Sequence, residues 1–506
     1  MDRLSKIFSD KITPLWLLPV FLLFTICNSA PHQQLDSANY YLEGLLTLRG
    51  YLPFLEFNDN KGPLLYYLLA IAAWLGGWGM WAGILLFRIL DGIIFLTLAN
   101  LLRLCGFSNG SQVFGLLLFI LAYAGCFPFP DETIYSETPE LLFRILGYSL
   151  YIRSGSATMS GGCFAVALLF RQTAVVDLFV VTIHQLVLLF SKKTNLTKVI
   201  SHSTQFFTGV LIPVTIVMVL AYQQGWLSEY WHQAFWWNYK FSNSGSETGV
   251  RLFLVPLSYL ATLEWFPILL IILVWLLLCA KRLGKLAYSS TSSFSRLLIA
   301  LALFAHLAES AASPLWYAHH YIPALMIFSI VGADTLDQLV NWLSKNAVMY
   351  KLYIALCLPL TLLIILIGLV RFDAFNSYMK EEPPDQEIAT WVQEHSVGND
   401  TILVWGYAPQ IYLLSQRYPA SRFHHNLFLS NQSRRFLPLD EDFISNFRRD
   451  IAFKKPKYII LTNGEDAYPD LVEYLPLVAL EYKKTAVELT DKEISVLSHT
   501  REILSE

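Results

Sequence analysis

Long apolar stretches alternate with short polar segments along most of the chain. Runs such as 81–102, 266–280 and 352–370 approach or reach the roughly 20 residues that cross a bilayer as an α-helix. Of the 506 residues, 55% are hydrophobic and only 15% are charged, so the apolar side chains far exceed what one soluble core can bury. The pattern therefore predicts a mostly α-helical fold, a polytopic transmembrane bundle.

The basic residues between the apolar runs predict the topology, because Lys and Arg are enriched in short cytoplasmic loops. Their alternation places the N-terminus inside and the C-terminus outside. About eleven spans are expected, near residues 12–30, 82–104, 111–127, 139–152, 158–171, 173–190, 206–223, 252–280, 296–313, 318–340 and 351–372. This parity requires 62–80, which is apolar but interrupted by Pro63 and several glycines, to be a juxtamembrane helix of the first outer loop.

Charged residues become frequent after residue 371, and no later stretch is long enough to span a membrane. We expect a transmembrane catalytic domain over 1–372 and a small soluble extracytoplasmic α/β domain over 373–506. Within the second domain, helices are predicted at 386–395 and 441–453, and short strands at 401–405 and 458–461. A lid, an acceptor-binding element and a scaffold are its alternative roles.

The charge balance excludes one class of partner. The chain has 36 basic and 39 acidic residues, a net charge of −3, and no concentrated basic face. We therefore expect membrane lipids as a partner and no nucleic acid.

The first outer loop carries the strongest candidates for chemistry. Asp36 closely follows the first span, and Lys61 stands directly before Gly62-Pro63. A carboxylate can take a proton from an acceptor hydroxyl, and a lysine can offset the charge of a departing phosphate. Asp59 and other charged residues share this loop, and an ordinary solvated surface is the alternative for any one of them.

The second outer loop is acidic and ends at the mouth of a helix. Glu137 and Glu140 there could provide oxygen ligands for a divalent ion such as Mg²⁺ or Mn²⁺. The alternative is that the helix dipole favours acidic side chains at a helix N-terminus.

Two arginines lie within or between apolar runs, where a charge is costly and is usually paired or functional. Arg88 is one to two turns into the second span, and Arg171 falls at the break between two short spans. Both could reach a lipid phosphate.

The remaining candidates are aromatic residues and histidines. Trp236 and Tyr239 belong either to an interfacial aromatic belt or to the wall of a sugar or prenyl site. In the pair His319-His320, neighbouring residues of an α-helix point about 100° apart, so one histidine that reaches a phosphate is favoured over a shared metal ion.

These motifs occur in an order that resembles the GT-C superfamily of polyprenyl-phosphate-sugar glycosyltransferases, in the group of protein O-mannosyltransferases and lipid A aminoarabinose transferases. The resemblance implies a catalytic base or metal ligand at Asp36 and a carrier-phosphate contact at Lys61. It also implies functional roles for Arg88, Arg171, His320, Tyr321 and Glu140, or Glu137 in place of Glu140. Asp59, Trp236 and Tyr239 are candidates for sugar or acceptor binding.

The implied function is transfer of a sugar, with inversion, from a polyprenyl-phosphate-linked donor to a lipid, glycan or protein acceptor. The distribution of basic residues places this activity on the outer side of the membrane. The resemblance implies a bacterial inner or plasma membrane, and a divalent metal ion is a candidate cofactor. A transporter or flippase of a lipid-linked or anionic substrate is the alternative, since it would also need buried arginines and an aromatic cavity.

Overall fold

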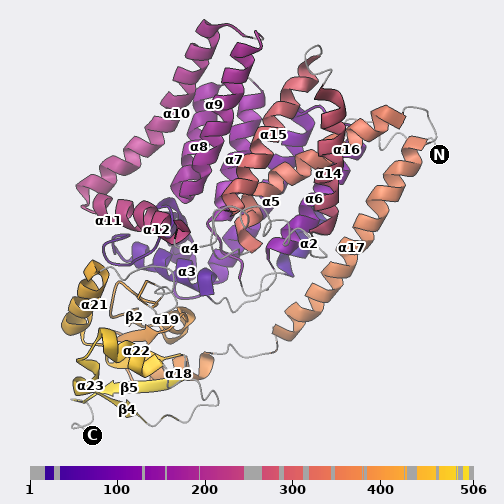
Figure 1. Ribbon diagram of the computed structural model, residues 1–506. Coiled ribbons are helices and arrows are strands. Elements are labelled where there is room, and N and C mark those ends of the chain that lie inside the picture. The colour runs from indigo at the N-terminus through magenta and orange to yellow at the C-terminus, as the bar shows by residue number, and fades with distance from the viewer. Residues whose placement is uncertain are drawn as a thin grey trace.

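The computed structural model describes residues 17–27, 35–127, 132–153, 156–192, 194–243, 265–283, 290–311, 318–343, 348–378, 380, 385–426, 428–429, 441–462, 467–485, 487 and 494–500. These residues form a helical bundle with a small α/β unit at one end (Figure 1). The parts of the expected spans at 12–16, 28–30, 252–264 and 312–313 lie outside the described residues.

The bundle is built from helices that each overlap one expected span. They are α2 (Leu17–Ile26), α5 (Trp81–Leu104), α6 (Asn109–Cys126), α7 (Glu137–Ile152), α8 (Ala157–Phe170), α9 (Val175–Phe190), α10 (Leu196–Gln223), α14 (Phe266–Leu283), α15 (Ser290–Ala311), α16 (Leu325–Leu343) and α17 (Val348–Tyr378). Two short 3₁₀-helices, η1 (Gln172–Ala174) and η3 (Ala318–Ala324), precede α9 and α16.

Within the part of the chain that the structure describes, six apolar segments are long enough to cross a membrane: Trp81–Leu104, Asn109–Cys126, Gln172–Phe190, Leu196–Gln223, Ala318–Val340 and Ala355–Ser377. The last of these is only 11% buried, so its apolar side chains suit contact with lipid. The protein is therefore an integral membrane protein. The count of eleven spans is not confirmed, because the other helices of the described chain are shorter or more polar than these six.

Helices α8 and α10 approach each other through glycines. A Cβ atom added to Gly161 would lie 2.0 Å from the carbonyl oxygen of Phe206, and one added to Gly209 would lie 1.9 Å from that of Thr158. Small residues allow such backbone contact between helices in a membrane. This packing holds α8, and with it the break at Arg171, in place.

Two expected outer loops are largely helical. The first contains α3 (Leu35–Leu48) and α4 (Leu64–Gly76), which pack closely at Gly44, and α4 lies within the segment expected to form a juxtamembrane helix. The third, which follows the span expected at 206–223, contains α11 (Leu227–Trp231), the π-helix η2 (His232–Trp237) and α12 (Asn238–Asn243). The Gln233 side chain of η2 donates a hydrogen bond to the Phe54 carbonyl over 2.8 Å, which ties the third loop to the first.

The C-terminal unit, which comprises the described residues of 385–500, contains a five-stranded sheet in the order β2-β1-β3-β5-β4. Its strands are β1 (Thr401–Trp405), β2 (Tyr418–Pro419), β3 (Tyr458–Leu461), β4 (Tyr482–Thr485) and β5 (Ser495–His499). Its helices are α18 (Gln386–Glu394), α19 (Gln410–Ser415), α21 (Glu441–Lys454), α22 (Ala467–Tyr474) and α23 (Val478–Glu481). Strand β1 pairs in parallel with β2 and β3, whereas β5 is antiparallel to β3 and β4. The predicted strands and helices of this region are confirmed.

The C-terminal unit lies against the end of the bundle that carries α3, α4, α11 and α12 (Figure 1). Tyr418 of β2 stacks on Tyr51, with ring centroids 6.2 Å apart, and also contacts Trp78 at 5.1 Å. Phe428 packs at 4.8 Å from Trp237 of η2. Aromatic contacts therefore fasten this unit to the polar end of the bundle.

The glycine contact between α8 and α10 predicts that Gly161→Ala destabilises the protein by about 1–3 kcal/mol, because the added methyl group would overlap the Phe206 carbonyl. Gly162→Ala is the matched control, since its Cβ would have 3.7 Å of clearance from the nearest atom. Thermal unfolding of the two variants in detergent micelles measures the effect, and equal unfolding temperatures would contradict this packing.

Candidate active site

Asp36 lies in the first turn of α3, where a negative charge is favoured by the helix dipole. Its Oδ1 accepts a hydrogen bond from the hydroxyl of Tyr407, which follows β1 of the C-terminal unit. No described residue donates a hydrogen bond to its second oxygen, Oδ2, and the side chain is half-buried. One oxygen of this carboxylate is therefore held, and the other can receive a proton.

Lys61 ends a tightly held loop directly before α4. The amide of Gly62 donates a hydrogen bond to the carbonyl of Phe170 over 3.0 Å. A Cβ on Gly62 would lie only 2.1 Å from the carbonyl oxygen of Leu169, so only glycine fits at this position. The loop thus fixes Lys61 beside the junction of α8 and α9, with its Nζ 5.9 Å from the centre of the Tyr40 ring.

Arg171 occupies the predicted break between α8 and α9, where its backbone is extended, with φ of −153° and ψ of 128°. Its Nη1 forms an ion pair of 2.7 Å with Oε1 of Glu137, the first residue of α7. The neighbouring Gln172 donates its side-chain amide to the carbonyl of Asn60 over 3.2 Å. The helix break is thereby bound both to α7 and to the loop that carries Lys61.

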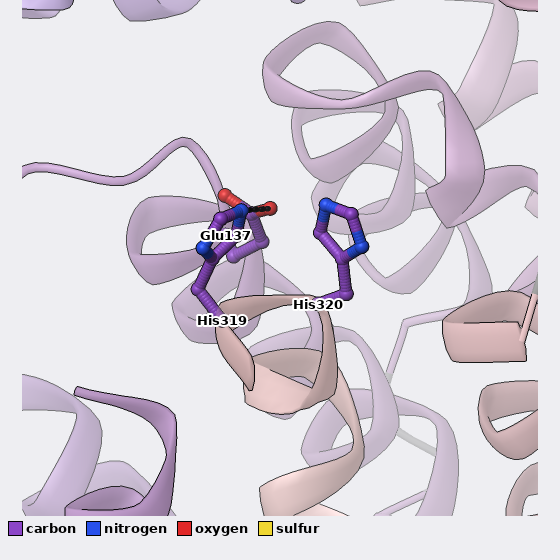
Figure 2. Close-up of side chains that lie close together, drawn as sticks. All are labelled: Glu137, His319 and His320. Atoms are coloured by element: carbon purple, nitrogen blue, oxygen red, sulfur yellow. Dashed lines mark ion pairs between the residues drawn. The ribbon is translucent and has the colours of Figure 1, made fainter. Parts of the chain in front are cut away.

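Two histidines of η3 face the same glutamate (Figure 2). His319 Nε2 lies 3.9 Å from Glu137 Oε1. One ligand atom each from Glu137, His319 and His320 falls within 4.8 Å of the others, so this group could hold a metal ion. The sequence had favoured a contribution from only one histidine, whereas the observed side-chain orientations bring both to Glu137.

The residues above share one electrostatic environment. His319 interacts with the charges of Asp36, Lys61 and Arg171 as well as with Glu137. Lys61 interacts with Glu137. The resulting set, termed the charged cluster, consists of Asp36, Lys61, Glu137, Arg171, His319 and His320. It places the basic side chains of Lys61 and Arg171 and a half-buried carboxylate at the end of an apolar bundle, where charges interact more strongly than in bulk water.

Asp59 lies behind Lys61 and is only 5% exposed. Its carboxylate accepts hydrogen bonds from the hydroxyl of Tyr66 over 3.0 Å and from the amide of Asn60 over 2.6 Å. Burial raises the pKa of Asp59, and it raises the pKa of the nearby buried Glu43 well above its ordinary value. The observed contacts of Asp59 shape the loop that holds Lys61.

Arg88 is bound within the bundle. Its Nη1 donates to the carbonyl of Thr25 in α2 over 2.9 Å and lies 3.2 Å from Asp91 in its own helix. The contact with Thr25 links α5 to α2.

Glu140 belongs to a second set of buried charges. Arg144 contacts Glu140 at 2.5 Å, Asp177 at 3.1 Å and Glu309 at 2.7 Å, and all four side chains are at most 2% exposed. His306 Nε2 lies 2.9 Å from Asp177. The structure therefore groups Glu137, but not Glu140, with the histidines that could bind a metal ion.

The aromatic candidates lie in different surroundings. Trp236 and Tyr239 stack on each other with ring centroids 5.8 Å apart, and they remain 47% and 62% exposed. Lys240 covers the Trp236 ring at 5.2 Å. Tyr321 is buried beside Trp265, 5.4 Å between ring centroids.

No sequence motif predicted that the C-terminal unit would contact α3 through specific polar side chains. His424 Nε2 lies 2.6 Å from Asn39 Oδ1 and 3.3 Å from Glu43 Oε1, next to the contact of Tyr407 with Asp36. The sequence does show adjacent histidines at 424–425 and a tyrosine directly after Trp405-Gly406. Nothing in it predicts that these residues contact α3.

The arrangement of the bundle, the helical loops and the C-terminal unit is similar to that of solved GT-C membrane glycosyltransferases. Two crystal structures of ArnT from Cupriavidus metallidurans are similar to this chain. The form bound to undecaprenyl phosphate has a TM-score of 0.59 at 12% identity and covers 96% of this chain and 97% of its own. The apo form has a TM-score of 0.58 at 13% identity and covers 97% and 98%.

A third similar structure is the archaeal oligosaccharyltransferase AglB from Archaeoglobus fulgidus, in complex with an inhibitory peptide and a dolichol-phosphate. It has a TM-score of 0.55 at 12% identity, with 96% of this chain and 74% of AglB covered. No family model and no curated protein sequence matches the chain. The resemblance found in the sequence is thus confirmed in the fold.

The buried charges around Arg144 predict that Arg144→Met destabilises the protein by about 3–5 kcal/mol, because three buried carboxylates would lose their counter-charge. Arg153→Met is the control, since Arg153 is exposed and directly follows the last residue of the same helix. The unfolding temperature of purified protein provides the measurement, and an Arg144→Met variant as stable as Arg153→Met would show that these contacts do not stabilise the fold.

Proposed function

We propose that this protein is a glycosyltransferase that moves a sugar from a polyprenyl-phosphate-linked donor to an acceptor hydroxyl or amine, with inversion at the anomeric carbon. The observation that carries the proposal is that a rigid loop fixes Lys61 in the same charged cluster as the half-buried Asp36. Two similar structures, which are bound to undecaprenyl phosphate and to dolichol-phosphate, add support for the donor class.

The proposed step breaks the bond between the anomeric carbon and the phosphate oxygen. The acceptor oxygen or nitrogen forms the new bond from the opposite face and passes its proton to Oδ2 of Asp36. The bonding electrons leave with the polyprenyl phosphate, whose charge Lys61 offsets. Arg171 and His320 are the other proposed phosphate contacts.

The other predicted site residues keep supporting roles in the proposal. Arg88 and Tyr321 would shape the donor side, and Asp59 would hold the loop of Lys61. Trp236 and Tyr239, being exposed, offer an aromatic surface for sugar or acceptor. The acceptor is a lipid, a glycan or a protein.

The charged cluster and the C-terminal unit are proposed to lie on the outer side of a bacterial inner or plasma membrane, as the distribution of basic residues indicates. In this arrangement, residues 1–372 form the catalytic domain and 373–506 form the extracytoplasmic domain. A polyprenyl carrier would then enter from the lipid beside the bundle.

A divalent metal ion fits one part of the cluster. Glu137, His319 and His320 offer one oxygen and two nitrogen ligands, a donor set that suits Mn²⁺ or Zn²⁺ better than Mg²⁺. When bound, such an ion would add positive charge near the donor phosphate. Arg171 already neutralises Glu137 through its ion pair and thus competes with a cation.

This competition gives a test. If the group binds cations, Arg171→Ala should bind Mn²⁺ more tightly than the wild type, because a competing positive charge is removed, and His319→Ala and His320→Ala should bind it more weakly. Isothermal titration of purified protein with Mn²⁺ measures these affinities, with His202→Ala on α10 as the control. Weaker Mn²⁺ binding by Arg171→Ala, or none by the wild type, would contradict a metal site here.

The proposed base gives the main test of function. Asp36→Asn should lower transfer by about 100-fold or more, since the amide cannot accept the proton, while undecaprenyl phosphate still binds. The assay uses radiolabelled undecaprenyl-phosphate mannose, glucose and aminoarabinose, with a bacterial envelope extract as acceptor. Glu56→Gln, an exposed acidic residue of the same loop, is the control. Unchanged transfer by folded Asp36→Asn would contradict the proposed mechanism.

A further inference from the structure

The carboxylate of Asp36 is held by a residue from outside the helical bundle. Tyr407 and Asp36 are 371 positions apart in the sequence, yet the Tyr407 hydroxyl reaches Asp36 Oδ1. An ionised carboxylate has no proton to give, so the phenol is the donor. Burial and the charge of Asp36 raise the pKa of Tyr407 well above its ordinary value, which keeps this proton on the phenol at neutral pH.

The position of Tyr407 is fixed by the end of strand β1. Gly406 passes so close to Thr462 that a Cβ would lie 1.7 Å from the Thr462 hydroxyl oxygen. The carbonyl of Gly406 also accepts a hydrogen bond from the amide of Asn426 over 3.2 Å. These contacts orient the turn after β1 so that the side chain of Tyr407 lies against α3.

The same face of α3 receives a second side chain from the C-terminal unit. Asp36, Asn39 and Glu43 are spaced three and four residues apart, so they share one face of the helix. His424 contacts Asn39 and Glu43 on the turns that follow Asp36. The contact of Tyr407 is therefore one end of a continuous polar interface.

We infer that Tyr407 is a positioning residue for Asp36, which holds Oδ1 so that Oδ2 is presented to the acceptor. This inference rests on the proposed function, in which Asp36 is the base. The C-terminal unit would then complete the site, because the orientation of the base depends on a side chain that the bundle does not supply. In the transfer step the acceptor proton goes to Oδ2, while Tyr407 keeps its own proton and its hydrogen bond to Oδ1.

Tyr407→Phe tests this role, because it removes the hydroxyl and keeps the ring. We expect kcat to fall about tenfold, the effect of one lost hydrogen bond to a charged group, and the donor KM to change by less than about twofold. The substrate is whichever radiolabelled undecaprenyl-phosphate sugar the wild type turns over. Tyr418→Phe is the matched control, since Tyr418 packs in the same interface by its ring and its hydroxyl makes no hydrogen bond to a described residue.

The outcomes separate this inference from the proposed function. If Tyr407 only fastens the C-terminal unit to the bundle, Tyr407→Phe should have a lower unfolding temperature, while the folded enzyme keeps the wild-type kcat. That result would overturn the inference. If Asp36→Asn abolishes transfer and Tyr407→Phe behaves like Tyr418→Phe, the proposed function stands and the positioning role fails. If Asp36→Asn retains full transfer, or the wild type turns over no donor, the proposed function itself fails.

Discussion

The hydrogen bond between the amide of Gly62 and the carbonyl of Phe170 determines how the site is assembled. A helix that breaks within an apolar bundle leaves backbone groups that must find new partners. Here the end of α8 finds one in the loop before α4, and only glycine allows the approach. The same contact places Lys61 beside Arg171, so the requirement to satisfy a broken helix also brings two cations together.

Groups on three elements, α7, η3 and α3, surround Lys61 and Arg171. Glu137 of α7 pairs with Arg171, the histidines of η3 face the same glutamate, and Asp36 approaches from α3. A site for an anionic lipid needs positive charge that is held without being fully neutralised. Lys61 meets this condition, since its described cation contact is the face of the Tyr40 ring and not a paired carboxylate. The deeper ion pairs of Arg144 stabilise the helices on which these groups are mounted.

Features encoded in short segments could be predicted from the sequence. The break at Arg171, the juxtamembrane helix after Gly62-Pro63 and the strands at 401–405 and 458–461 each depend on a local pattern of apolar, glycine and proline residues. Tyr407 and Asp36 are 371 positions apart in the sequence, and Arg144 and Glu309 are 165 positions apart. No local sequence pattern predicts contacts between such distant residues. The helical third loop was missed because its aromatic residues also suit an open interfacial loop.

In the proposed function, Lys61 receives the phosphate of a lipid carrier next to Asp36. The most direct measurement is an experimental structure of the full chain with undecaprenyl phosphate in a lipid nanodisc. We predict phosphate density in contact with the Lys61 side chain, within the charged cluster and on the same side as Oδ2 of Asp36. Phosphate density at the other end of the bundle, near Lys192 and Lys198, would contradict it.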